Sequence, residues 1–311
     1  MSATAFAKPQ RLVPGDRVTV VAPAGPIERD SLEAGLRVLA GRYEATWEPG
    51  LLSRARYLAG DDARRAGELR AAFGDAGTKA VIAGRGGYGS LRLLPRVWPG
   101  GAPDGGPPAP DRAKLVVGFS DITALHCALQ AMGRVSIHGP SVNQLATQPR
   151  AVVERFFALL EDTTAPAAGI AGSPLVGGVA EGPLLGGNLS LLTRLLGTPW
   201  LPDLDGAILL LEDVTERPYK IDRMWTHLRL AGALEKIRGL ALGEFTDCEE
   251  PGADFTSQDV LWSLAAETGL PCVAGLPIGH GAVNVPVALG TRVRLDGGAG
   301  TLSFLEPAVV G

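Results

Sequence analysis

One serine of the chain stands between a predicted strand and a predicted helix, where its hydroxyl can act as a nucleophile. The apolar run 115–119 leads into Ser120, and after Asp121 apolar residues recur at helical spacing as far as Met132. The chain must therefore turn sharply at Ser120. Such an elbow exposes the hydroxyl and directs the first free N–H groups of the helix at the bond under attack. The alternative is that Ser120 or Asp121 only caps the helix.

A serine hydroxyl needs a base to take its proton, and four histidines compete for that role. His126 and His227 lie within helical patterns, which favours structural roles. His138 precedes a Gly-Pro pair and is a reserve candidate. His280 stands between two glycines after the apolar run 273–278, so its ring is expected to be accessible at the end of a strand or loop. We therefore predict His280 as the base, with a plain turn residue as the alternative.

A third group must orient the base, and a carboxylate at the end of a strand suits this role. Glu212 directly follows the apolar run 207–211. Its carboxylate could accept a hydrogen bond from an imidazole N–H, fix the tautomer and stabilise the imidazolium. Asp213 would point to the other side if the strand continues, because side chains alternate. Glu244, which also follows an apolar run, is a competitor.

A glycine-rich turn over 84–89 formally fits the G-x-G-x-x-G pattern of dinucleotide-binding proteins. The fit is weak, because the turn does not follow the first predicted strand and the acid about twenty residues on is Asp104, within a Pro/Gly-rich segment. The turn is better suited to an oxyanion hole, in which the N–H of Gly87 or Gly86 and the N–H of Asp121 hold a developing negative charge. A plain glycine turn is the third interpretation.

The elements that must position these residues alternate in the first half of the chain. Apolar runs at 18–22, 80–83 and 115–119 are predicted strands, and helical patterns lie between them, the one after Asp61 being capped by that residue. This order predicts an α/β fold with parallel strands and helical crossovers. The segment 98–112 is rich in Pro and Gly and is expected to form a surface loop.

Composition divides the chain into two predicted domains. Residues 162–178 are rich in Ala, Gly, Pro and Thr, so we expect a linker between an N-terminal α/β domain, 1–161, and a C-terminal domain, 179–311. The second half is mixed and ends in a hairpin-like pattern over 293–305. The predicted serine lies in the first domain, and the predicted acid and base lie in the second.

Charge and cysteine content exclude several classes of function. The net charge is −4 with no basic block, which argues against nucleic-acid binding and anionic membranes. No signal-like or bilayer-spanning apolar run is present, so we expect a cytoplasmic protein without membrane association. The three cysteines, Cys127, Cys248 and Cys272, are far apart and are expected to be reduced. No Cys/His spacing resembles a metal site, so no metal or cofactor is expected.

Several segments together resemble a known family. They include VVAPAGP, AVIAGRGGYGSLRLL, VVGFSDITAL, IHGPS, GPLLGGNLSLLTRLLGTPW, LLLEDVTERPYKIDRMWTHLRLAG and GLPIGHG, in order from about Val20 to Val287. The chain is similar in these segments to the L,D-carboxypeptidase (muramoyltetrapeptide carboxypeptidase) serine peptidases, a family that includes microcin C immunity-type peptidases. The resemblance implies a Ser-Glu-His triad of Ser120, Glu212 and His280. The long Pro/Gly segment before Lys114 departs from the usual, more compact pattern.

The resemblance also implies a fold and an activity. It implies a flavodoxin-like N-terminal domain, a β-rich C-terminal domain, an active site in the cleft between them and a homodimer. The implied reaction is metal-free acyl transfer that releases terminal D-alanine from L-alanyl-γ-D-glutamyl-meso-diaminopimelyl-D-alanine in peptidoglycan recycling. An immunity-type peptidase that cleaves an amide between an acidic residue and a nucleotide is the alternative. A third hypothesis, a non-catalytic ligand-binding or dinucleotide-binding protein, would retain ligand binding without these catalytic side chains.

A carboxypeptidase must also bind the free carboxylate of its peptide substrate, and cationic side chains do this best. Arg85 lies beside the oxyanion glycines, and Arg217, Lys220 and Arg223 follow Glu212. Each is a candidate, with a solvated surface charge as the alternative. The amide of Asn188, at the start of a predicted helix, could face the cleft or could only cap that helix.

Overall fold

The computed structural model describes residues 6–99, 114–164 and 169–311, and its N-terminal part is built on a six-stranded sheet. Five strands are parallel and follow the order β2-β1-β3-β4-β5. Their bounds are β1 (Arg17–Val21), β2 (Glu44–Thr46), β3 (Thr78–Ala83), β4 (Leu115–Gly118) and β5 (Ser136–His138). This is the flavodoxin-like order, so the predicted fold class is confirmed. The order reverses between β1 and β3, which creates a crevice at their carboxyl ends.

Helices cover both faces of this sheet. The apolar side chains of α1 (Arg29–Ala40), α5 (Val142–Leu145) and α6 (Arg150–Glu161) belong to the buried cluster on one face. Those of α2 (Asp62–Gly74), α3 (Leu94–Val97) and α4 (Thr123–Ala131) belong to the cluster on the other. Asp61 caps α2 as predicted, since its carboxylate accepts a hydrogen bond from the Arg64 N–H at 2.8 Å. Short 3₁₀ turns, η1 (Pro49–Leu52), η2 (Ser90–Leu93) and η3 (Ser120–Ile122), complete the loops.

The C-terminal part contains an eight-stranded mixed sheet that nearly closes into a barrel. Its order is β6-β14-β13-β8-β9-β10-β11-β7. The strands are β6 (Ile170–Ala171), β7 (Ser173–Val176), β8 (Val179–Asn188), β9 (Ile208–Val214), β10 (Gly239–Thr246), β11 (Cys272–Ala274), β13 (Arg292–Asp296) and β14 (Thr301–Phe304). The two edge strands, β6 and β7, are separated in sequence only by Gly172. The two edges of the sheet must therefore meet at that residue.

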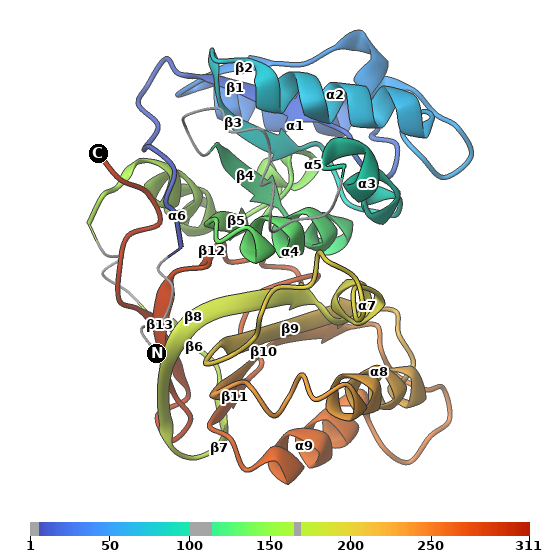
Figure 1. Ribbon diagram of the computed structural model, residues 1–311, viewed down its shortest axis with the longest axis vertical. Helices are drawn as coiled ribbons and strands as arrows, with labels where there is room; N and C mark the ends of the chain where they lie inside the picture. Colours follow the sequence, from blue (N-terminus) through green and yellow to red (C-terminus); the bar gives the residue numbers. More distant parts are fainter. Residues whose placement is uncertain (1–5, 100–113, 165–168) are drawn as a thin grey trace.

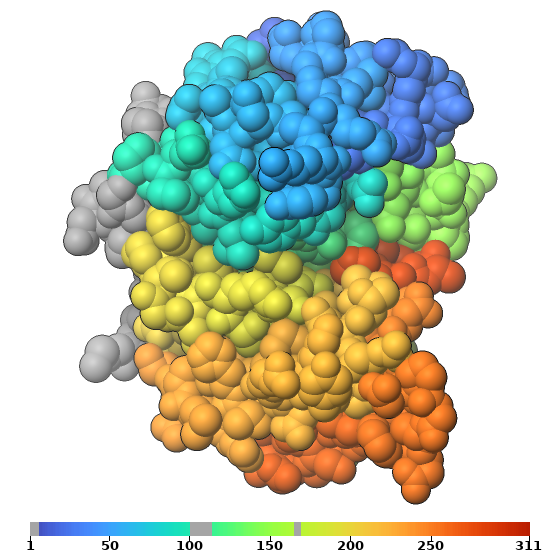
Figure 2. Space-filling view, turned by 90° about the vertical axis from the view of Figure 1, so that its right-hand side faces the viewer, coloured from blue at the N-terminus to red at the C-terminus, as the bar shows by residue number. Residues whose placement is uncertain are grey.

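Helix α4 lies between the two sheets and joins the domains (Figure 1). The Gln130 side chain of α4 exchanges two hydrogen bonds with the backbone of Gly186 on β8, at 3.2 and 3.5 Å. The Thr123 hydroxyl accepts the N–H of Asn188 at 3.0 Å. In Figure 2 the two parts stack along a continuous boundary, with α7 (Leu189–Arg194) and α8 (Pro218–Leu230) in the lower one.

The predicted domain boundaries differ from the observed pairing in two places. Ile170–Ala171 and Ser173–Val176 of the expected linker form β6 and β7, because their backbone groups pair with β14 and β11. Strand β12 (Val287–Leu289), from the predicted C-terminal domain, adds to the N-terminal sheet antiparallel to β5. The Pro/Gly segment 98–112 lies almost wholly outside the described residues.

Candidate active site

Ser120 occupies the sharp turn between β4 and η3. Its φ of +61° lies in the left-handed region, which costs a non-glycine residue about 1–3 kcal/mol. Gly86 packs directly on its side chain, because a Cβ at Gly86 would lie 2.9 Å from the Ser120 Oγ. The serine therefore has the strained backbone and close glycine contact of a nucleophile elbow.

Two buried side chains fasten the elbow. The Asp121 carboxylate accepts the N–H of Ser90 at 2.7 Å and so ties the elbow to the end of the glycine-rich turn; burial raises the pKa of this carboxyl. His126 Nε2 donates to the Gly118 carbonyl oxygen at 2.8 Å, and its Nδ1 accepts from the Ser136 hydroxyl at 2.9 Å. Complete burial lowers the pKa of His126 to about 3, so the ring is neutral and structural.

Glu212 and His280 form a hydrogen-bonded pair. His280 Nδ1 donates to the Glu212 Oε2 at 2.6 Å, and the carboxylate is fully buried. Burial alone would raise the pKa of Glu212, but the hydrogen bond from His280 and the two nearby imidazoles, His138 and His280, lower it below its ordinary value. Burial opposes the charged form of His280, yet Glu212 outweighs it and raises the pKa of the imidazole. Because Nδ1 is bonded to Glu212, Nε2 is the ring nitrogen that is left to accept a proton.

The elbow and His280 are brought together by Phe119. The Phe119 ring, one residue before Ser120, lies against the His280 ring with centroids 4.8 Å apart. His280 retains 15% side-chain exposure, whereas Glu212 has none. His280 is therefore the partly exposed member of the pair, and Glu212 is the buried one.

The loop that carries His280 is anchored from both domains. Gly279 passes so close to Glu212 that a Cβ there would lie 2.5 Å from Oε2, and its φ is +116°, so only glycine fits without strain. Its N–H donates to the Asn284 side chain at 3.0 Å. The N–H of Asn284 in turn donates to Gln148 of the N-terminal domain at 2.9 Å. Sequence reasoning missed Asn284 and Gln148, because isolated loop amides carry no local signal.

His138, the reserve candidate, lies behind the Glu212 carboxylate. Its Nε2 is 3.8 Å from Glu212 Oε1, beyond hydrogen-bond distance, and its side chain is fully buried. Neither ring nitrogen of His138 has a hydrogen-bond partner among the described residues. The ring therefore acts on Glu212 only through space.

Asp213, the neighbour of Glu212, faces α7. It accepts hydrogen bonds from the Asn188 side chain and from the N–H groups of Ser190 and Val214, each at 2.9 Å. Burial, and then the nearby Glu212 charge, raise the pKa of Asp213 to about 6. Asn188 also accepts the Leu191 N–H at 3.1 Å. This geometry gives Asn188 a capping role and leaves its substrate contact a prediction.

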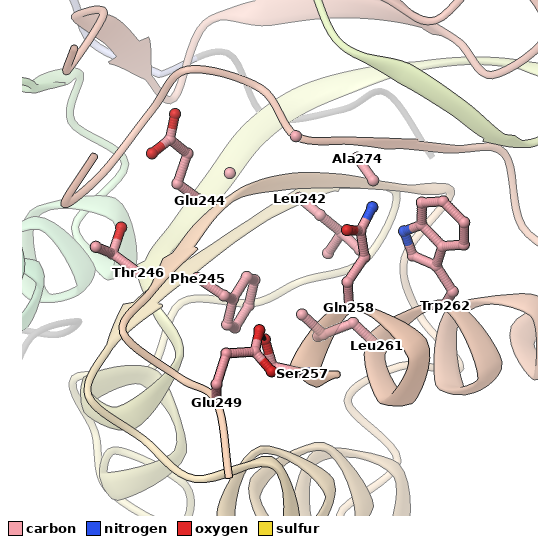
Figure 3. Close-up of a pocket in the computed structure, with 12 residues that line it drawn as sticks. Leu242, Glu244, Phe245, Thr246, Glu249, Ser257, Gln258, Leu261, Trp262 and Ala274 are labelled. Carbon is pink, nitrogen blue, oxygen red and sulfur yellow. Dashed lines mark hydrogen bonds between the residues drawn. The ribbon is translucent and has the colours of Figure 1, made fainter. Parts of the chain in front are cut away.

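Glu244, the competing acid, lines a separate pocket. Figure 3 shows its carboxylate projecting from β10 away from Gln258 and Trp262 of α9 (Ser257–Thr268). This pocket, of about 450 Å³, lies between the strand and the helix. The Glu244 carboxylate lies against Gly281, and burial raises its pKa. No hydrogen bond joins it to a histidine within the described ranges, so Glu212 alone of the two acids is bonded to His280.

The predicted cations lie in two places. Arg85 follows β3, and its guanidinium donates to the Pro26 carbonyl oxygen at 3.0 Å beside the glycine-rich turn. Arg217 donates to the Glu249 carbonyl oxygen at 2.5 Å in the C-terminal domain. Lys220 forms an ion pair with Glu216 at 3.3 Å, and Arg223 lies over the Tyr219 ring. Of these cations, only Arg85 belongs to the turn that packs on Ser120.

Within the described part of the chain, the predicted oxyanion donors are free to bind a substrate oxygen. The N–H groups of Gly87 and Asp121 make no hydrogen bond with any other described residue. Gly87 has a φ of +117°, and a Cβ there would lie 3.1 Å from Gly25, so the turn requires glycine. Asp104, the acid considered for the dinucleotide-binding hypothesis, lies outside the described residues.

The part of the chain that the structure describes shows neither a metal-binding cluster nor a membrane-spanning helix. No group of three or more His, Cys, Asp or Glu side chains in the described ranges has a geometry that could hold a metal ion. No helix in that part of the chain is both long and apolar enough to cross a membrane.

Comparisons with known proteins follow the same division into two domains. Residues 18–139 match the LD-carboxypeptidase N-terminal domain, and residues 181–295 match the LD-carboxypeptidase C-terminal domain. The murein tetrapeptide carboxypeptidase of Pseudomonas aeruginosa is 35% identical over 304 residues, covering 90% of this chain and 93% of that protein. The crystal structure of muramoyltetrapeptide carboxypeptidase from Oxalobacter formigenes is 29% identical, with a TM-score of 0.78 over 92% of this chain and 97% of that one.

A second structural neighbour is more distant in sequence. The structure of MccF in complex with glutamyl sulfamoyl guanosine has a TM-score of 0.83 over 97% of this chain and 99% of that chain, at 19% identity. At this identity the likeness shows a shared fold. The two domain matches and the Pseudomonas relative establish more: the chain belongs to the LD-carboxypeptidase family and is a serine-type carboxypeptidase.

Proposed function

We propose that the enzyme releases the terminal D-alanine from murein tetrapeptides through Ser120, His280 and Glu212, without metal or cofactor. It would act as a cytoplasmic homodimer in peptidoglycan recycling. The observation that carries the proposal is the 2.6 Å bond between Glu212 and His280, next to a serine with a φ of +61°. The names of the Pseudomonas and Oxalobacter proteins support murein peptides as the substrate class.

The proposed reaction is acyl transfer in two steps. His280 Nε2 takes the Ser120 proton as Oγ bonds to the carbonyl carbon of the last amide, and Glu212 stabilises the imidazolium that forms. The C–N bond then breaks, and His280 returns the proton to the amine of the departing D-alanine. Water, deprotonated by the same histidine, hydrolyses the resulting serine ester.

The charge on the carbonyl oxygen needs donors that are already in place. The N–H groups of Gly87 and Asp121, which make no hydrogen bond within the described ranges, are the proposed oxyanion hole, with Gly86 as the alternative first donor. Such donors cost no reorganisation during the reaction. Arg85, on the same turn, is the proposed cation for the substrate carboxylate.

The test is mass-spectrometric detection of D-alanine release from purified murein tetrapeptide. Wild-type protein should release D-alanine with and without EDTA, and Ser120→Ala should lose at least about 10⁴-fold in rate. No release by folded wild-type protein would contradict the proposed substrate. An acyl-nucleotide amide would then be assayed, since the fold shared with MccF favours that substrate as the second candidate.

A further inference from the structure

A basic cavity lies at the point where the strand order of the N-terminal sheet reverses. It has a volume of about 550 Å³ and is lined by the loops after β1 and β3 and by the segment before α2. Parallel sheets bind ligands in the crevice at the carboxyl ends of the strands on either side of such a reversal. The cavity therefore occupies the position that this fold class uses for binding.

The cavity adjoins the proposed nucleophile. Gly87 lines it, and the preceding residue, Gly86, packs on the Ser120 side chain. In a C-terminal amino acid only the Cα separates the carboxylate from the scissile nitrogen, so a carboxylate oxygen lies within about 4 Å of that nitrogen. A site for the leaving carboxylate must therefore be next to the serine, as this cavity is.

The lining is cationic in a chain of net charge −4. Arg54, Arg56 and Arg85 all line the cavity, and no acidic residue does. Arg54 pairs with Glu28 at 2.5 Å, but both side chains are more than half exposed, so this pair holds little free energy and can exchange. Arg56 forms no ion pair with any described residue. Guanidinium groups bind carboxylates through paired N–H donors.

The segment that carries Arg56 is held in place. Arg56 itself has a φ of +58°, which is unfavourable for a non-glycine residue and persists only where the surroundings enforce it. A bridge between Ala55 and Leu58 closes the turn, and the Ala59 N–H donates to the Ala24 carbonyl oxygen at 2.9 Å. These bonds fix the turn to the loop after β1, so the arginine starts from a defined backbone position.

Two tyrosines bound the cavity. The rings of Tyr57 and Tyr88 meet edge to face with centroids 5.7 Å apart, and both side chains are about half exposed. Such a pair offers a short apolar wall with two hydroxyl donors at its rim. A small side chain such as the methyl group of alanine would lie against such a wall while the carboxylate meets the arginines.

We propose that this cavity is the site for the free carboxylate of the leaving C-terminal amino acid, and that Arg56 and Arg54 act there with Arg85 as specificity-determining residues. The inference rests on the proposed function and extends it from one cation, Arg85, to a binding site formed by three arginines. A nucleotide phosphate shares the anionic oxygen chemistry that the arginines recognise. The leaving carboxylate is favoured because of the short distance to the scissile bond.

The test compares a murein tetrapeptide with its C-terminal carboxamide. Wild-type protein should prefer the free acid, and Arg56→Ala should lower kcat/KM for it about 10- to 100-fold, mainly through KM. The loss for the carboxamide should be less than about threefold. Arg150→Ala, which removes an exposed guanidinium on α6, is the matched control and should leave both substrates unchanged. An equal loss for both substrates, or none for the free acid, would overturn the proposal.

A binding measurement separates this site from the proposed activity. Calorimetry with Ser120→Ala protein should show weaker binding of the free-acid tetrapeptide once Arg56→Ala is added, and unchanged binding of the carboxamide. If wild-type protein cleaves neither peptide, the proposed function fails, and the same calorimetry still decides the site. Arg56-dependent binding of an acyl-nucleotide amide, without such dependence for the free-acid peptide, would reassign the cavity to phosphate and refute the carboxylate site.

Discussion

Two carboxylates that are adjacent in the chain, Glu212 and Asp213, lie on opposite faces of β9 in different surroundings. Glu212 lies on the side of Leu210, toward the interior of the C-terminal sheet, and accepts a hydrogen bond from His280. Asp213 lies on the side of Leu211, toward the helices, and accepts N–H groups from the Asn188 side chain and Ser190 at the start of α7 and from Val214 of its own strand. The two carboxylates thus occupy neighbouring positions on the strand, and the face of the sheet on which each lies determines its hydrogen-bond partners.

The surroundings also shift the pKa values of the two carboxyls in opposite directions. Two histidines near Glu212 lower its pKa, whereas burial and the Glu212 charge raise the pKa of Asp213 to about 6. Glu212 is therefore ionised at neutral pH, as an orienting acid must be. In our account Asp213 serves the fold and Glu212 serves the reaction.

The largest effect is expected from Glu212→Gln. The amide keeps the shape but removes the charge that orients His280 and stabilises its imidazolium, so kcat should fall about 10³- to 10⁴-fold with little change in KM. Steady-state D-alanine release measures this loss, and a thermal melt controls for folding. A loss of less than tenfold would remove Glu212 from the catalytic account.

Asp213→Ala is expected to affect stability instead. The substitution leaves the N–H groups of Asn188, Ser190 and Val214 without their acceptor, which should lower the free energy of unfolding by about 1–3 kcal/mol. Urea unfolding followed by circular dichroism measures the change. An unchanged midpoint would mean that these bonds contribute nothing to the fold.

The two histidines near Glu212 should also differ in their importance for activity, His280 being essential and His138 not. His138→Gln should lower kcat/KM by less than about tenfold, because Nε2 is 3.8 Å from the carboxylate and only a through-space effect is lost. His280→Gln, assayed in parallel, should lose most activity. Comparable losses from both variants would refute His280 as the sole base.

The smallest effect concerns the pH dependence of stability. The pKa of Asp213 is raised from 3.8 to about 6 in the folded protein, so the folded state keeps a proton that the unfolded state releases between these values. Its contribution to stability is therefore fully present below about pH 4 and is lost as the pH rises through about 6. Urea unfolding between pH 4 and about 7 should show a weaker dependence for Asp213→Asn than for wild type. Identical slopes would contradict the raised pKa.

The sequence predicted the features that depend on local pattern. Apolar runs located the parallel strands, Asp61 was identified as a cap, and strict alternation placed Asp213 away from Glu212. The flavodoxin-like order followed from a resemblance rather than from periodicity. These features need only a few consecutive residues or a known relative.

Features that depend on distant pairing could not be predicted. Strands β6, β7 and β12 have two to four residues each, too few for a period to be visible, and they form because distant backbone groups pair with them. The contact of Asn284 with Gln148 and the approach of Arg56 to the glycine-rich turn are set by loop packing. No spacing in the sequence encodes such contacts.

The most direct test of the central claim is to measure D-alanine release by Glu212→Gln and Asp213→Asn side by side. Both variants replace a buried carboxylate by its amide on the same strand, so they differ only in the face that they alter. Our account predicts a loss of at least about 10³-fold for Glu212→Gln and of less than about tenfold for Asp213→Asn. Equal losses, or a larger loss for Asp213→Asn, would contradict it.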